Sequence, residues 1–257
     1  MESKILTSKT ILFDQPIDGN MISRPVIIKT CAKIDNLKSY PIVIALHGRG
    51  GSNKNWVQPL SKFTNSGEFI GVYPQGHLNS WNLGQEPSNA DDIAFISNVI
   101  DTLLSYSNVD ENKIFAVGNS NGSGMVNMLG GVNKRLKAIA PIASQLTERT
   151  EIKSNAIPLS VFQVNGDQDL LIPIGGGMKI GHPFLSVSES AKKWASNFNC
   201  NQYVAVEEAE QSISHTYFDC DDNVVVKYLV LKGAGHNISR YYSSLWTDVW
   251  DFFSSLD

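Results

Sequence analysis

A serine lies between two glycines at the point where an apolar run ends. The stretch is Gly118-Asn119-Ser120-Asn121-Gly122, and it directly follows Ile114–Val117. It fits the pattern G-x-S-x-G, in which a strand turns sharply into a helix and holds one side chain at the tip. The residues two before and two after that side chain come close together, so a Cβ at either would clash. The pattern predicts an exposed nucleophile, although a glycine-rich loop with an ordinary serine has the same composition.

A serine hydroxyl is a weak nucleophile and needs a neighbouring base, which in turn needs an orienting acid. For a serine at such a turn the chain order is serine, acid and then a histidine after the last strand. His236 fits, because it directly follows the last apolar run, and Gly233 and Gly235 let its loop bend back towards Ser120. The remaining histidines are expected elsewhere: His215 in a polar edge segment, and His77 and His182 in loops.

The acid is expected after the apolar run Leu159–Val164, where the loop offers Asp167 and Asp169. Asp169 precedes an apolar pair and Pro173, so its side chain is expected to turn inward where the loop re-enters the fold. Asp167 stands beside Gly166 and could instead form a hydrogen bond within the turn, as aspartate commonly does. We therefore predict Asp169 as the acid and keep Asp167 as the alternative.

The glycine-rich loop His47–Gly51 follows another apolar run. Attack on an ester places negative charge on the carbonyl oxygen, and backbone N–H groups must meet that charge. We predict that Asn121 N–H, next to the serine, and Arg49 N–H, between glycines, form this oxyanion hole. A tight turn explains the glycines equally well, but not the coincidence with the other loops.

The elements that position these loops are apolar, β-branched runs alternating with helix-like segments. Such strands belong to a parallel sheet covered on both faces, and catalytic loops gather at the carboxyl ends of its strands. We predict an α/β, doubly wound, mostly parallel sheet in one domain, residues 1–257, with an antiparallel edge formed by residues 11–14 and 25–30. The predicted strands are residues 42–46, 69–73, 113–117, 136–143, 159–164 and 224–231, and the predicted helices are residues 91–106, 124–129, 186–198 and 239–255.

Composition narrows the possible partners. The chain has 257 residues, 42% of them hydrophobic, and a formal net charge of −4, which argues against nucleic acid as a partner. No apolar run approaches the roughly 20 residues of a membrane span. The first ten residues contain no apolar signal-peptide region, so we expect either an intracellular protein or one that has lost a leader. No Cys or His cluster has metal-ligand spacing, and the predicted chemistry needs no cofactor.

The chain has three cysteines, of which Cys31 is expected in the core. Cys200 and Cys220 flank a polar stretch. From the residues alone they form either a disulfide or two separate thiols.

The assembled motifs resemble esterases of the polyhydroxybutyrate depolymerase and feruloyl esterase type, within the α/β-hydrolase superfamily. The resemblance covers most of residues 41–237, through PIVIALHGRGGS, VYPQGHLNSWN, VDENKIFAVGNSNGSGM, NGDQDLLIP and LKGAGH. It implies that Asp169 is the acid, that Trp81 lies beside the active site and that Cys200 and Cys220 form a disulfide. Among the departures from the family pattern, Asn165 stands in place of a histidine and Ser123 in place of a glycine.

These motifs predict a serine ester hydrolase that uses a Ser-His-Asp triad and an acyl-enzyme. Expected substrates are feruloyl or acetyl esters of polysaccharide, or short polyesters such as polyhydroxybutyrate. The segment between Ala143 and Leu159 is too short for a large cap domain, so we expect an open site, with Trp81, Trp56 and His47 as candidate substrate contacts. Trp81 and Trp56 could stack on a sugar or a phenolic ring, and the alternative for each is simple core packing. The alternatives are a thioesterase or oligopeptidase on the same scaffold, or a protein that binds polysaccharide without cleaving it.

Overall fold

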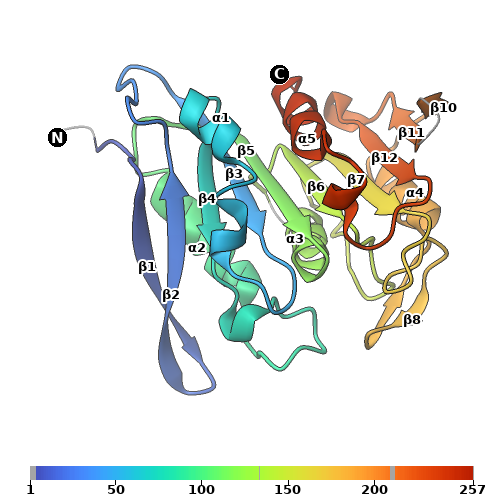
Figure 1. The fold of residues 1–257 in the computed structure, drawn as a ribbon, viewed down its shortest axis with the longest axis horizontal. Helices are drawn as coiled ribbons and strands as arrows, with labels where there is room; N and C mark the ends of the chain where they lie inside the picture. Colours follow the sequence, from blue (N-terminus) through green and yellow to red (C-terminus); the bar gives the residue numbers. More distant parts are fainter. Residues whose placement is uncertain (1–3, 133, 209–211, 257) are drawn as a thin grey trace.

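A computed structural model describes residues 4–132, 134–208 and 212–256, so the ends of the predicted 1–257 domain lie outside the described residues. Its centre is a ten-stranded sheet in the order β1-β2-β4-β3-β5-β6-β7-β12-β11-β10, seen in Figure 1 with β1 and β2 at one edge and β11 and β10 at the other. The strands in this spatial order are β1 (Lys9–Ile17), β2 (Asn20–Lys29), β4 (Ile70–Pro74), β3 (Tyr40–Leu46), β5 (Val109–Asn119), β6 (Ala138–Ile142), β7 (Ser160–Gly166), β12 (Val226–Leu231), β11 (Ser212–Phe218) and β10 (Gln202–Glu208).

The predicted parallel sheet is confirmed at its centre. All pairings from β4 across to β12 are parallel. The predicted N-terminal antiparallel edge is also confirmed, because β1 pairs with β2, and β2 pairs with β4, in antiparallel register. The hairpin β10–β11 closes the opposite edge in antiparallel register and was not predicted. A separate short hairpin, β8 (Gly177–Lys179) with β9 (His182–Phe184), lies outside this sheet.

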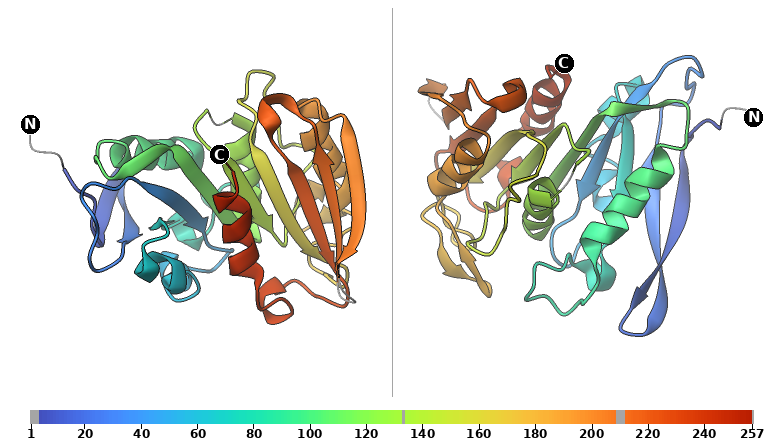
Figure 2. Two further views of the ribbon diagram at one scale, coloured as in Figure 1. Left: turned by 90° about the horizontal axis from the view of Figure 1, so that it is seen from above. Right: turned by 180° about the vertical axis from the view of Figure 1, so that it is seen from behind.

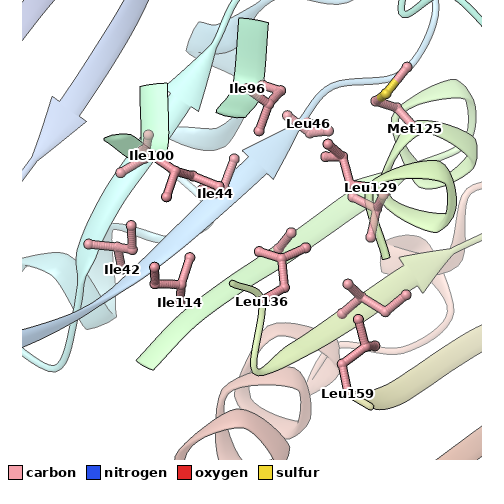
Figure 3. Close-up of a cluster of buried hydrophobic side chains, with 14 of the residues drawn as sticks. Ile42, Ile44, Leu46, Ile96, Ile100, Ile114, Met125, Leu129, Leu136 and Leu159 are labelled. Atoms are coloured by element: carbon pink, nitrogen blue, oxygen red, sulfur yellow. The ribbon is translucent and has the colours of Figure 1, made fainter. Parts of the chain in front are cut away.

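Alternating side chains of the central strands supply two cores, one on each face of the sheet. In β3, Ile42, Ile44 and Leu46 join the first core, shown in Figure 3. Val43 and Ala45 join the second, as expected for strands with opposite-facing neighbours. Helices α2 (Asp92–Leu103), α3 (Asn121–Val132) and α4 (Val187–Asn197) contribute to the first core, and α1 (Ser61–Ser66) and α5 (Leu245–Ser254) to the second. Figure 2 shows α2 and α5 on opposite sides of the sheet, so the sheet is doubly wound.

The helix ends follow local capping chemistry. Asp91 caps α2 by accepting a hydrogen bond from Ala94 N–H at 2.9 Å. Ser186 caps α4 in a reciprocal capping box with Glu189. Helix α5 begins at Leu245, later than the predicted start at residue 239, because the preceding segment forms a separate short 3-10 helix, Ile238–Arg240, and turns.

A buried ion pair fastens β2 to the start of α2. Arg24 lies 2.6 Å from a carboxylate oxygen of Asp92, and their side chains are 2% and 0% exposed. Burial lowers the pKa of Arg24 and raises the pKa of Asp92, and the attraction between them only partly offsets this. The other Asp92 oxygen accepts a hydrogen bond from Asn82 N–H at 2.7 Å, so this carboxylate also anchors the segment that precedes α2.

The cysteines divide into one bridged pair and one free thiol. Cys200, just after α4, and Cys220, just after β11, form a disulfide, as the resemblance implied. Cys31 is free and half-buried, and its thiol contacts Lys33 O at the end of β2. The expectation that Cys31 lies in the core is therefore wrong, because the chain has already left the sheet at that residue.

Candidate active site

Three side chains that lie far apart in the sequence form one hydrogen-bonded chain. Ser120 Oγ lies 2.9 Å from His236 Nε2, although the two residues are separated by 116 positions. The other ring nitrogen, Nδ1, lies 2.7 Å from Asp169 Oδ2. A carboxylate only accepts, so Nδ1 carries the proton and Nε2 accepts from the serine hydroxyl. The arrangement is that of a nucleophile, a base and an orienting acid.

Ser120 occupies a strained turn between β5 and α3. Its φ is 56°, a left-handed conformation that non-glycine residues rarely adopt. A Cβ added at Gly118 would lie 2.2 Å from Gly122 O, as the sequence argument expected. The reason for Gly122 differs, because its Cβ would meet Leu46 O at 2.2 Å and His47 O at 2.6 Å. The second glycine therefore lets the start of α3 pack against the end of β3.

The loop after β7 holds both candidate aspartates in distinct roles. Asp169 is 3% exposed, and its Oδ1 accepts hydrogen bonds from Leu171 N–H and Ile172 N–H at 2.8 and 2.9 Å. These bonds aim its other oxygen at His236. Asp167 was expected to bond within its own turn, but its carboxylate accepts from Gly233 N–H at 2.7 Å. It therefore braces the loop that carries His236.

The predicted oxyanion loop lies against Ser120. A Cβ added at Gly48 would lie 3.5 Å from Ser120 Cβ, so the backbone leading to Arg49 passes directly beside the serine. The loop is held by a hydrogen bond from Gly50 N–H to Asn79 O at 2.8 Å. Among the turn, loop and cap hydrogen bonds of the described residues, neither Arg49 N–H nor Asn121 N–H donates to a backbone group. Both stay the predicted donors for a substrate oxygen.

Comparison with known proteins finds esterases. The chain is 28% identical over 233 residues to feruloyl esterase B from Piromyces equi, an alignment that covers 83% of this chain and 42% of that protein. It is 23% identical over 229 residues to a bifunctional acetylxylan esterase/xylanase from Neocallimastix patriciarum, covering 83% of this chain and 31% of that protein. The chain thus spans less than half the length of these two relatives. No protein-family model matches it.

Among solved structures, an acetyl xylan esterase from Aspergillus awamori superposes with a TM-score of 0.65 at 14% identity, covering 95% of this chain and 99% of that one. The chain has the α/β-hydrolase fold. In this fold the nucleophile follows a central strand, and acid and histidine follow later strands. Ser120 after β5, Asp169 after β7 and His236 after β12 have these places in the sheet.

Two predicted substrate contacts are buried in this α/β-hydrolase fold. Trp81 is 0% exposed, and its indole N–H donates to His47 O at 2.8 Å, so it has no free ring face for a substrate. His47 is 2% exposed, with Nδ1–H donating to Gly48 O at 2.8 Å and Nε2 accepting from Gly76 N–H at 3.0 Å. Burial lowers the pKa of His47 despite the hydrogen bond to Gly48. Both side chains support the oxyanion loop, and the expectation of ring stacking on Trp81 is wrong.

A cavity of about 340 Å³ adjoins the candidate nucleophile. Gly48, Arg49 and Asn119 form the wall beside Ser120, and Trp56 and Trp246 form an aromatic wall, with ring centroids 4.9 Å apart. Trp56 is only 4% exposed and packs in the second core, so the edge that lines the cavity is all that a substrate could touch. Its role as a substrate contact stays a prediction. Trp246 was not predicted as one, because it falls in an amphipathic stretch, Leu245–Ser254, whose pattern is that of a helix packed on a sheet.

The other histidines have partners of their own. His77 Nδ1 lies 3.0 Å from Ser88 Oγ. His215, on β11, lies 2.6 Å from Tyr203 OH and stacks on Tyr228. His182 was expected in a loop, but it lies on β9, is 2% exposed and contacts Glu86.

The described residues offer neither a metal-binding cluster nor a membrane-spanning helix. Residues 4–132, 134–208 and 212–256 contain no group of three or more His, Cys, Asp or Glu side chains placed to hold a metal ion. Across the same ranges, no helix has the length and apolar character needed to cross a bilayer.

Proposed function

We propose that this chain is a serine carboxylic ester hydrolase, folded as a single α/β-hydrolase domain. The observation that carries the proposal is the continuous hydrogen-bonded chain from Ser120 through His236 to Asp169. Support also comes from the names of the relatives, which are feruloyl and acetylxylan esterases. Ser120 and His236 are both half-buried, so a substrate can reach the hydroxyl.

In the first half of the reaction, Ser120 Oγ attacks the ester carbonyl carbon while His236 Nε2 takes the hydroxyl proton. Asp169 stabilises the imidazolium that forms and keeps its ring oriented. Negative charge moves to the carbonyl oxygen, where the N–H groups of Arg49 and Asn121 meet it. As the carbon–oxygen bond to the alcohol breaks, the imidazolium returns its proton to the leaving oxygen, and the acyl group remains on the serine.

In the second half, His236 removes a proton from a water molecule, whose oxygen attacks the acyl carbon. The same oxyanion donors hold the second tetrahedral intermediate. Its collapse breaks the bond to Ser120 Oγ, which takes back the proton from the imidazolium. The products are a carboxylic acid and an alcohol, and the protein returns to its starting state.

The proposed substrates are feruloyl or acetyl esters carried on polysaccharide, with short polyesters as the second candidate. The half-buried Trp246 and an edge of Trp56 line the cavity next to Gly48 and Asn119, which favours a substrate with a flat ring that packs there. Residues 143–159, between β6 and β7, are all described and contain no helix. Such a connection is too short to form a large cap domain, and an open site would suit esters attached to a bulky carrier.

The test compares hydrolysis of methyl ferulate, acetylated xylan, polyhydroxybutyrate, an acyl thioester and a peptide anilide by the wild type and Ser120→Ala. We expect the highest kcat/KM on one of the first two esters and loss of that activity in the variant. Faster turnover of the thioester or anilide contradicts the proposed substrate class. Turnover of none of the five contradicts the proposal of a hydrolase and favours a protein that only binds polysaccharide.

A further inference from the structure

The buried carboxylate of Glu86 contacts the side chains of Arg49 and Asn121, the two residues predicted to supply the oxyanion donors. Glu86 belongs to the segment between Trp81 and α2, and its side chain is 0% exposed. One carboxylate oxygen, Oε2, accepts hydrogen bonds from its own segment: Leu83 N–H at 2.7 Å and Gln85 N–H at 3.2 Å. These two bonds fix the orientation of the carboxylate, so the other oxygen, Oε1, points away from its own segment.

That second oxygen contacts three other parts of the chain. Arg49 NH2 lies 2.8 Å away, His182 Nε2 lies 3.0 Å away and Asn121 Nδ2 lies 3.4 Å away. Arg49 and Asn121 are the two residues whose backbone N–H groups are predicted to form the oxyanion hole. A single oxygen atom therefore bonds to the side chains of both residues, which come from different loops. His182 adds the hairpin β8–β9 to the same centre.

The Asn121 amide is also held by the backbone of Trp81. Its Oδ1 accepts from Trp81 N–H at 2.7 Å, and its Nδ2 donates to Trp81 O at 3.0 Å. The start of α3 is thus fastened to the segment that carries Glu86. The Arg49 side chain is 47% exposed and contacts this segment through its ion pair with Glu86. The predicted oxyanion loop is already joined to this region by the bonds from Gly50 N–H to Asn79 O and from the Trp81 indole to His47 O. The Glu86 carboxylate adds a link that reaches the side chains of Arg49 and Asn121 themselves.

The charge state of Glu86 suits this role. Burial alone raises the pKa of a carboxyl group, but hydrogen bonds from Leu83 N–H, His182 and Gln85 N–H outweigh it and lower the pKa of Glu86. Glu86 is ionised at neutral pH and accepts five hydrogen bonds. An ionised acceptor holds a guanidinium at a defined place more firmly than a neutral one does.

Building on the proposed hydrolase function, we propose that Glu86 is a positioning residue that sets the separation of the Arg49 and Asn121 N–H groups. It does not touch the substrate. An oxyanion hole works only when its donors already lie at the place where charge develops, so an error in their spacing costs rate rather than substrate binding. The role predicts a loss in kcat with little change in KM.

The test substitutes Glu86→Gln, which keeps the shape but removes the charge and turns one end of the group into a donor. With p-nitrophenyl acetate, we expect kcat to fall about 10- to 100-fold, less than the full loss of one oxyanion donor, with KM changed by less than about threefold. Inhibition by a trifluoromethyl ketone, whose adduct carries an oxyanion, should weaken about 10-fold or more. The matching methyl ketone forms no stable adduct, and its weak binding should not change.

Asp92→Asn is the matched control. Asp92 is an equally buried, ion-paired carboxylate that anchors the same segment at Asn82 N–H, next to Trp81, but it contacts neither Arg49 nor Asn121 directly. We expect this variant to have a lower melting temperature and a kcat within about threefold of the wild type, measured well below both melting temperatures.

An equal loss of kcat in both variants overturns the inference, because general loosening of the segment between Trp81 and α2 then explains the effect. Wild-type kcat and inhibitor affinity in Glu86→Gln also overturn it. A wild type that hydrolyses no ester at all contradicts the proposed function instead, so the two failures are distinguishable.

Discussion

Replacing Gly122 with alanine should separate the two proposed donors of the oxyanion hole, Arg49 N–H and Asn121 N–H. The added Cβ would lie 2.2 Å from Leu46 O and 2.6 Å from His47 O, and both are backbone atoms. Because real Cβ atoms essentially never come within 3.0 Å of such an atom, α3 and the end of β3 must part by about 0.8 Å. Asn121 is the residue just before Gly122 on the helix side of the contact, and Arg49 lies two residues after His47 on the strand side. The distance between the two proposed donors therefore grows.

A misplacement of about 1 Å in a catalytic group costs on the order of 100-fold in rate. We expect kcat/KM of Gly122→Ala on p-nitrophenyl acetate to fall by about that factor, which corresponds to about 2.7 kcal/mol of lost transition-state stabilisation. The overpacked contact should also lower the free energy of unfolding by about 1–3 kcal/mol, measured by urea denaturation. Activity is measured well below the melting temperature of the variant, so that unfolding does not contribute.

Gly175→Ala is the matched control, because a Cβ there meets no described atom within 4 Å and its φ is not positive. It should retain the activity and stability of the wild type. If Gly122→Ala is also as active as the wild type, within about threefold, then either the strand and helix part without moving the donors or the donors are not those proposed. Either result refutes the geometric argument.

Three further outcomes are expected. Asp169→Asn should lower kcat about 10³- to 10⁴-fold in steady-state assays. An amide N–H opposite Nδ1 of His236 favours the tautomer that carries its proton on Nε2, which cannot accept the Ser120 proton. Replacing Cys200 and Cys220 with serine should lower the free energy of unfolding by about 3 kcal/mol in urea titrations, given a sequence separation of 20 residues. The pKa of folded Glu86 lies below its ordinary value of 4.5. Its charged form therefore stabilises the fold above that pH, and the contribution is lost as the pH falls through the folded pKa. The stability gap between the wild type and Glu86→Gln should be present at pH 7 and close in acid.

The sequence predicted the central strands and the loops that follow them, because both depend on local signals. Buried parallel strands are apolar along their whole length, and the glycines around Ser120 mark a turn that few other residues allow. Chain order then distinguished His236 from the other histidines. The edge hairpin β10–β11 was missed because its strands carry many polar residues, so its pattern resembles that of a loop.

The supporting residues could not be predicted, because their roles depend on tertiary contacts. Trp81 and Glu86 lie in a segment rich in Gly, Asn and Ser, and no periodicity shows which of its side chains turn inward. In the structure, Trp81 packs beneath the oxyanion loop, and the Glu86 carboxylate collects donors from three other segments. The family resemblance placed this tryptophan beside the active site, and from there it could either stack on a substrate or pack in the core. Only the fold shows that its ring is covered.

Covalent labelling tests most directly whether Ser120 is the activated nucleophile. The wild type, Ser120→Ala and His236→Ala are each incubated with a fluorophosphonate, digested and analysed by mass spectrometry. We predict a single adduct on the peptide containing Ser120 in the wild type, no adduct in Ser120→Ala and labelling slowed at least about 100-fold in His236→Ala. A labelled Ser120→Ala protein, or equal labelling rates with and without the imidazole, would contradict the proposed mechanism.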